Sequence, residues 1–161
     1  MRLMSRGILK LEMPIKYCFA FFERMEHMAY ILIIDDDPDI AYASANVLRS
    51  EGHEIETQLV PEDAMKSIEK RRPDLIILDV MFPGDASGGF ELARWLSRKF
   101  KESKQSPVPV VMVSAINQKV PFGFSNNDID DSWLPVSEFM EKPIDFEVLK
   151  SKVKFLLSNP Q

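Results

Sequence analysis

Two short apolar runs, each followed at once by acidic residues, constrain this chain more than any other feature. The run Leu75–Leu78 ends at Asp79, and the run Tyr30–Ile34 ends at Asp35 and Asp36. Apolar runs without polar alternation are typical of strands covered on both faces, as in a parallel sheet between helices. Such strands deliver their carboxyl ends to one edge, so we expect three carboxylates to meet there. If Asp79 is considered without the other acidic residues, an alternative role is that it only caps the following turn.

Strand and helix signals alternate from Tyr30 onward, which is the pattern of a βαβ architecture. The expected strands are Tyr30–Ile34, His53–Val60, Leu75–Leu78, Val108–Val113 and Glu138–Glu141, and the expected helices begin at Pro38, at Pro61, near Gly89 and at Asp145. Ser114 follows the fourth strand and Lys142 follows the fifth. The sequence therefore predicts an α/β domain with polar groups at several strand ends.

Length and charge exclude several classes of protein. A chain of 161 residues suffices for one domain with a proper core. The net charge of -5 argues against nucleic-acid binding through a broadly basic surface. No apolar run reaches the roughly 18 to 20 residues of a membrane helix. Cys18 is the only cysteine, which excludes an intrachain disulfide and favours a reducing, cytoplasmic compartment.

The chain divides into three parts. Residues 1–28 differ in composition from the rest and lack a signal-peptide pattern, so we interpret them as a disordered N-terminal extension, a short packed helix or a start-site artefact before Met28. Residues 29–158 form the predicted domain. Residues 159–161 are a tail.

The polar residues at the strand ends stand in a recognisable order: Asp35–Asp36, Asp79, Ser114 and then Lys142–Pro143. This set resembles the receiver domain of two-component response regulators, over nearly the whole range 30–157. The resemblance implies a flavodoxin-like doubly wound sheet of five parallel strands in the order 2-1-3-4-5. It also implies a stand-alone receiver that takes a phosphoryl group from a histidine kinase or histidine phosphotransfer protein. Such a protein signals to a downstream protein target, with no direct role for nucleic acid or membrane.

The resemblance also implies a role for each matching residue. These roles are phosphoacceptor for Asp79, Mg²⁺ ligands for Asp35, Asp36, Asp79 and the backbone carbonyl of Met81, phosphoryl contacts for Ser114 and Lys142, and aromatic switch for Phe139. Before the reaction, we expect the Lys142 ammonium to pair with Asp79. The chemistry agrees, because Mg²⁺ prefers oxygen ligands and phosphoryl transfer mainly needs an aligned nucleophile and positive charge.

Two segments depart from the family pattern. The loop 84–89 is slightly longer than usual, which predicts extra flexibility beside the acceptor. In the stretch 116–136, Pro121, Gly123 and Pro135 interrupt helical hydrogen bonding. We therefore expect an irregular crossover between the fourth and fifth strands in place of a regular fourth helix.

Two other functions remain open from the sequence. Asp35 and Asp37 have the D-x-D spacing of haloacid-dehalogenase-like phosphatases, with Asp35 as nucleophile, although Asp39 stands where a hydroxyl residue is expected. The second is a degenerate receiver used only as a binding scaffold. Against it, every residue of the acceptor site is present.

Overall fold

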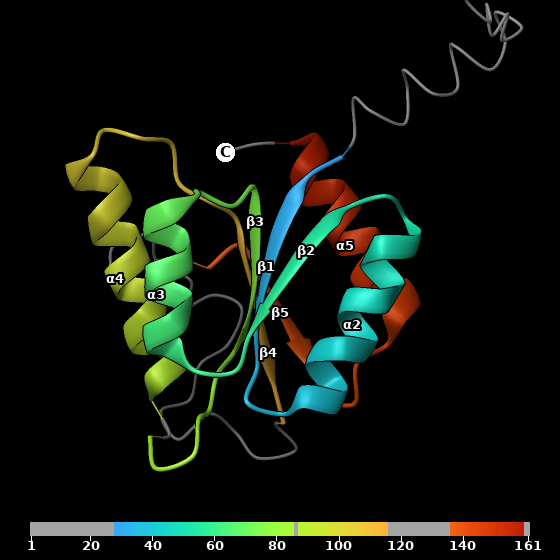
Figure 1. Ribbon diagram of the computed structural model, residues 1–161. Helices are drawn as coiled ribbons and strands as arrows, with labels where there is room; N and C mark the ends of the chain where they lie inside the picture. Colours follow the sequence, from blue (N-terminus) through green and yellow to red (C-terminus); the bar gives the residue numbers. More distant parts are fainter. Residues whose placement is uncertain (1–27, 86, 116–135, 160–161) are drawn as a thin grey trace, which may run out of the picture.

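The structure, a computed structural model, describes residues 28–85, 87–115 and 136–159. Within these residues five strands and four helices alternate along the chain (Figure 1). They are β1 (Tyr30–Ile34), α2 (Pro38–Ser50), β2 (Glu54–Gln58), α3 (Pro61–Lys70), β3 (Leu75–Asp79), α4 (Gly88–Glu102), β4 (Val110–Ser114), β5 (Glu138–Glu141) and α5 (Phe146–Ser158).

The five strands form one parallel sheet in the order β2-β1-β3-β4-β5. This confirms the doubly wound fold and the strand order expected from the sequence. The strand order reverses between β1 and β3, which are direct neighbours with Ile34 opposite Leu78. Ligands of open α/β sheets bind just beyond the strand ends at such a reversal. The acidic residues after β1 and at the end of β3 lie at that point.

Two hydrophobic cores lie on opposite faces of the sheet, because successive side chains of a strand point to opposite sides. Helices α3 and α4 cover one face, and α2 and α5 cover the other (Figure 1). The strand residues of the first core are Leu32, Ile34, Ile76, Leu78, Val110 and Met112. Ile55 of β2 and Met140 of β5 also belong to the second core, and β1, β3 and β4 contribute Ile31, Ile33, Leu75, Ile77, Val111 and Val113 to it. Burial on both faces explains why these strands are unbroken apolar runs in the sequence.

Aspartates begin the two helices that follow the ends of β1 and β5. The Asp37 carboxylate accepts hydrogen bonds from the Asp39 and Ile40 N–H groups, at 2.9 and 3.3 Å. Asp145 caps α5 in the same way. Capping of this kind satisfies N–H groups that lack a partner within the helix, and it typically stabilises by about 1 kcal/mol. Thus Asp37, although next to the acidic pair, acts as a helix cap.

The segment after β3 is closed by a tight turn. Phe82 and Asp85 exchange backbone hydrogen bonds of 3.0 Å, and Gly84 between them has a φ of 81°. That conformation suits glycine because it has no Cβ. The Phe82 side chain is buried in the α3/α4 core, so the turn is anchored to the domain.

Several sequence predictions fall outside the described residues. These are the character of residues 1–27, the irregular crossover over 116–135, and the tail from residue 160. Among the helices that the structure describes, none combines the length and the apolar character needed to cross a membrane.

Candidate functional site

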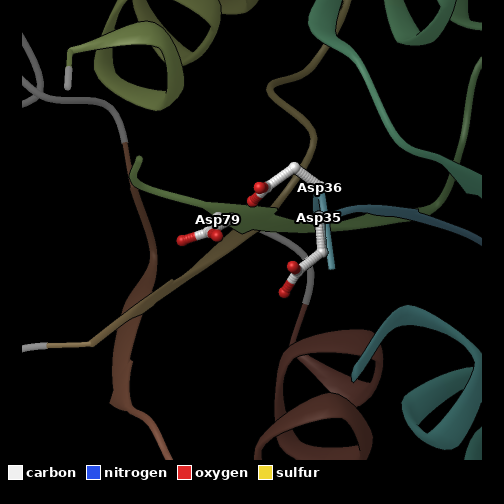
Figure 2. A group of neighbouring side chains, drawn as sticks. All are labelled: Asp35, Asp36 and Asp79. Carbon is white, nitrogen blue, oxygen red and sulfur yellow. The ribbon is translucent and has the colours of Figure 1, made fainter. Parts of the chain in front are cut away.

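Three carboxylates meet where β1 and β3 end, as the sequence predicted. Asp35 and Asp36 follow β1 directly, and Asp79 is the last residue of β3. Figure 2 shows the side chains of Asp35 and Asp36 leaving the chain in opposite directions, with Asp79 beside them on the neighbouring strand. One carboxylate oxygen from each residue lies within 4.8 Å of the others. The side chains of Asp35 and Asp79 are almost fully buried, and Asp36 is half-buried.

Lys142 brings a positive charge into this cluster from the end of β5. Its Nζ lies 2.9 Å from Asp35 Oδ2 and 2.9 Å from Asp79 Oδ2, so one ammonium bridges two buried carboxylates. The Lys142 backbone N–H also donates to the carbonyl of Ser114, at 2.7 Å, which ties the lysine to the end of β4. From the sequence we expected the contact with Asp79 but not the one with Asp35. No spacing in the chain indicates that second contact.

Burial and the neighbouring charges shift the pKa values of Asp35 and Lys142. Burial raises the pKa of Asp35, and the charge of Asp79 adds to this, while Lys142 and the Asp37 N–H oppose it. Burial alone would lower the pKa of Lys142, but the hydrogen bonds and charges of Asp35 and Asp79 outweigh it, and the pKa is raised. The Lys142 ammonium is thus stabilised in its charged form. Its attraction nevertheless does not cancel the rise that burial causes in the pKa of Asp35.

Backbone N–H groups fix the second oxygen of each buried carboxylate. The Asp37 N–H donates to Asp35 Oδ1 at 3.0 Å, and the Met81 N–H donates to Asp79 Oδ1 at 3.3 Å. The longer bond to Asp79 is the weaker of the two. Asp79 therefore keeps one oxygen that is only loosely held.

Ser114 adds a hydroxyl with no partner. It is the last residue of β4, its side chain is buried, and its Oγ forms no hydrogen bond to any described residue. A buried hydroxyl without a partner costs about 1 to 3 kcal/mol. This hydroxyl lies at the end of the strand that neighbours β3, and among the described residues it has no acceptor for its proton.

The remaining predicted site residues lie around this centre. Met81, two residues after Asp79, is exposed. Phe139 lies on β5 opposite Met112 and is half-buried against the α3/α4 core, so it is not part of the carboxylate cluster.

Gly89 packs against the end of β3, and the sequence did not indicate this contact. A Cβ at position 89 would lie 2.8 Å from both Cα and the carbonyl oxygen of Val80, and closer still to the carbonyl oxygen of Asp79. The Gly89 N–H also donates to the Val80 carbonyl, at 3.1 Å. The start of α4 thus packs directly on the backbone that carries Asp79. The adjacent pair Gly88–Gly89 was the only signal in the sequence.

The residues present suit a divalent metal ion. With all three carboxylates ionised, Asp35, Asp36 and Asp79 together with Lys142 sum to a charge of -2, which a divalent ion would balance. All the side-chain donors are carboxylate oxygens, the type that Mg²⁺ prefers over nitrogen and sulfur.

Comparison with known proteins places this geometry in a family. Residues 31–154 match the family described as the response regulator receiver domain. The transcriptional regulatory protein AfsQ1 of Streptomyces coelicolor is 30% identical over 130 residues, which are 81% of this chain and 52% of AfsQ1. The protein PilH of Pseudomonas aeruginosa is 27% identical over 134 residues, which are 81% of this chain and 99% of PilH.

Solved structures share the fold. A crystal structure of NtrX from Brucella abortus superposes with a TM-score of 0.63 at 29% identity, covering 81% of this chain and 28% of that one. This chain therefore spans about half of AfsQ1, little more than a quarter of the NtrX chain, and nearly all of PilH.

Proposed function

Because this chain belongs to the response regulator receiver domain family, we propose that Asp79 accepts a phosphoryl group from a phosphohistidine donor. The donor is a histidine kinase or a histidine phosphotransfer protein. The observation that carries the proposal is the position of Asp79 at the end of β3, buried, with Lys142 on one oxygen and two further carboxylates beside it. Receivers signal through this phosphorylation, and the cluster contains each group that the step requires.

In the proposed step, an oxygen of Asp79 attacks the phosphorus atom. A phosphorus–oxygen bond forms, the phosphorus–nitrogen bond to the donor histidine breaks, and the imidazole keeps the electron pair and takes up a proton. Little covalent work is asked of the protein beyond alignment and charge stabilisation. Lys142 releases Asp79 and pairs with a phosphoryl oxygen, while its contact with Asp35 keeps the ammonium in place.

We propose that Mg²⁺ is held by Asp35, Asp36, Asp79 and the backbone carbonyl of Met81. When bound, the ion would neutralise charge on the phosphoryl oxygens. Isothermal titration with Mg²⁺ tests the assignment. Asp36→Ala should weaken binding at least tenfold without loss of folding, because Asp36 makes no ion pair among the described residues. Wild-type affinity in this variant would exclude Asp36 as a ligand.

We propose that Ser114 and Phe139 report the phosphorylated state. The orphan hydroxyl of Ser114 donates to a phosphoryl oxygen, since hydrogen bonds to charged acceptors are stronger than neutral ones. Movement at the end of β4 is then passed to Phe139, whose ring packs in the same core as Trp95. In a Trp133→Phe background, beryllofluoride with Mg²⁺ should change Trp95 fluorescence. Ser114→Ala should shrink that change, and a full-sized response would exclude this route.

The proposed output is contact with a downstream protein target or relay of the phosphoryl group, in the cytoplasm and without direct contact to nucleic acid. AfsQ1 is named as a transcriptional regulator, but this chain spans only about half of it. The nearly complete coverage of PilH supports a single-domain mode of action.

The decisive experiment is tandem mass spectrometry after incubation with acetyl phosphate and Mg²⁺. The wild-type protein should gain one phosphoryl group on Asp79, and Asp79→Asn should gain none while keeping its fold. Asp63→Asn serves as the control, because Asp63 is an exposed carboxylate on α3. It should be labelled like the wild type.

The same experiment separates the alternatives. A phosphoryl group on Asp35 would support the phosphatase with Asp35 as nucleophile. No incorporation into correctly folded protein would support a scaffold without phosphoryl chemistry. Labelling of Asp79→Asn at the wild-type rate would show that the acceptor is another residue.

A further inference from the structure

The turn that ends helix α4 places Lys104 in a backbone conformation that is unfavourable for a residue with a side chain. The Lys104 N–H donates to the Lys101 carbonyl at 3.1 Å, and the Gln105 N–H donates to the Phe100 carbonyl at 3.0 Å. This pair of bonds defines a Schellman motif, in which the residue at the Lys104 position turns left-handed and is usually glycine. Lys104 has a φ of 53° and is the only non-glycine residue with positive φ in the described part of the chain.

The chain itself offers the comparison. Helix α2 ends with the same pair of bonds, from Gly52 to Arg49 at 3.0 Å and from His53 to Leu48 at 3.3 Å. There the left-handed residue is Gly52, with a φ of 98°. A side chain in this conformation is disfavoured because its Cβ approaches a carbonyl oxygen. Folding alone therefore favours glycine at position 104 as well, and the lysine there calls for another explanation.

Lys104 stands in a cluster of cations. The C-terminal ends of α3 and α4 lie side by side, at the opposite end of the molecule from the acidic site (Figure 1). Lys99 of α4 pairs with Glu69 of α3 at 3.0 Å, which holds the two ends together. The exposed cations at or just after these two helix ends are Lys70, Arg72, Arg98, Lys101 and Lys104, which we call the basic end. They outnumber the exposed acidic residues of the same helix ends, which are Glu69, paired with Lys99, and Glu102. No ion pair joins any of these five to a described residue.

One member of the basic end is already held in place. Arg72 Nη2 donates to the Ser106 carbonyl at 2.9 Å, and its guanidinium lies 5.4 Å from the centre of the Phe100 ring. Neither contact is with a carboxylate, and no ion pair joins Arg72 to a described residue, so Arg72 presents a cation that is held in place beside the end of α4. Ordering a charged side chain in advance lowers the entropic cost of binding.

We propose that the basic end binds a short acidic polypeptide segment of a partner protein. Carboxylates suit the guanidinium groups, which accept them in paired hydrogen bonds. The acidic segment must be short, because the rest of the molecule would repel it. The chain has a net charge of -5, and the opposite end carries the carboxylate cluster. A nucleic acid extending beyond the basic end would meet that negative field.

A membrane surface fits less well. Membrane-surface binding combines basic residues with inserted apolar side chains. The large exposed hydrophobic residues of the described chain are Met28, Tyr42, Leu59, Val60, Met81, Val148 and Phe155, and none belongs to the C-terminal ends of α3 and α4. The basic end is therefore charged without an apolar anchor.

The test is fluorescence anisotropy of a labelled decaglutamate peptide with the full chain at about 50 mM salt. The wild-type protein should bind, and the affinity should fall steeply with added salt. Lys104→Gly should weaken binding about threefold while raising Tm by about 3 °C, because it removes a charge and relieves the backbone. Lys104→Gln should weaken binding equally without raising Tm.

Two control variants complete the experiment. Lys154→Gln removes an exposed cation on α5, away from the basic end, and should leave peptide binding unchanged. Gly52→Lys places lysine in the matching position of α2 and should lower Tm. If Lys104→Gly leaves Tm or peptide binding at wild-type values, the proposal is overturned.

The probe comparison decides the class of partner. Tighter binding of a 20-base-pair DNA duplex, or of phosphatidylserine vesicles, than of decaglutamate would overturn the assignment to an acidic polypeptide. So would failure of decaglutamate to bind at all. The proposal does not depend on the acceptor, since all these variants should still be phosphorylated on Asp79.

Discussion

Replacing Gly89 with alanine tests whether the start of α4 sets the position of the end of β3, which carries the proposed acceptor Asp79. The added methyl group would overlap the Asp79 carbonyl oxygen and lie 2.8 Å from two backbone atoms of Val80. Backbone atoms cannot swing aside as a side chain can, so α4 and the end of β3 must separate. The acceptor carboxylate should move with the strand.

The size of the effect follows from three contributions. Overpacking by one methyl group costs about 1 to 3 kcal/mol. Weakening the 3.1 Å hydrogen bond from Gly89 to Val80 adds about 1 kcal/mol. The higher helix propensity of alanine than of glycine offsets up to about 1 kcal/mol of this loss. We therefore expect Gly89→Ala to lower the free energy of unfolding by about 1 to 3 kcal/mol.

Gly88→Ala is the matched control, because the same methyl group is added one residue earlier. There the nearest atoms are Asp85 Oδ2 at 3.1 Å and Phe82 Cδ2 at 3.2 Å, and the exposed Asp85 side chain can rotate away. We expect a loss of about 1 kcal/mol or less. Urea unfolding measures both variants, and acetyl phosphate labelling should be slowed only in Gly89→Ala. Equal stability and equal labelling of the two variants would refute the reasoning.

Three further predictions concern buried polar groups. Lys142→Met should lower stability at pH 7 by about 3 kcal/mol in urea unfolding, because two buried carboxylates lose their partner, and added Mg²⁺ should restore part of the loss. Ser44→Ala should raise stability by about 1 kcal/mol in thermal melts, since Ser44 Oγ is buried in α2 with no partner among the described residues. Burial, then the hydrogen bond to Glu56, raises the pKa of Tyr30 above its ordinary 10.0. The unfolded chain thus loses this proton first, so wild-type stability should fall as pH rises above about 10, and Tyr30→Phe should show a smaller fall.

Much of the fold was predictable because its signals are local. Apolar runs such as Tyr30–Ile34 identify buried strands, and Pro38 and Pro61 mark helix starts. The boundaries were less certain. The fourth strand begins at Val110, two residues later than expected, after Pro109, which has no N–H to donate to a sheet.

The sequence by itself determined which residues stand at the strand ends, and hence that carboxylates gather at one edge of a parallel sheet. The order along the chain was enough, because parallel strands end at the same edge. Only the tertiary structure decided which groups touch. The bridge from Lys142 to Asp35 joins residues more than a hundred positions apart. That Ser114 lacks a partner among the described residues depends on what surrounds its side chain. The need for glycine at position 89 arises from a helix packed against a strand end. Such contacts depend on the distances between helices and strands, and the residue pattern within one helix or strand does not determine those distances.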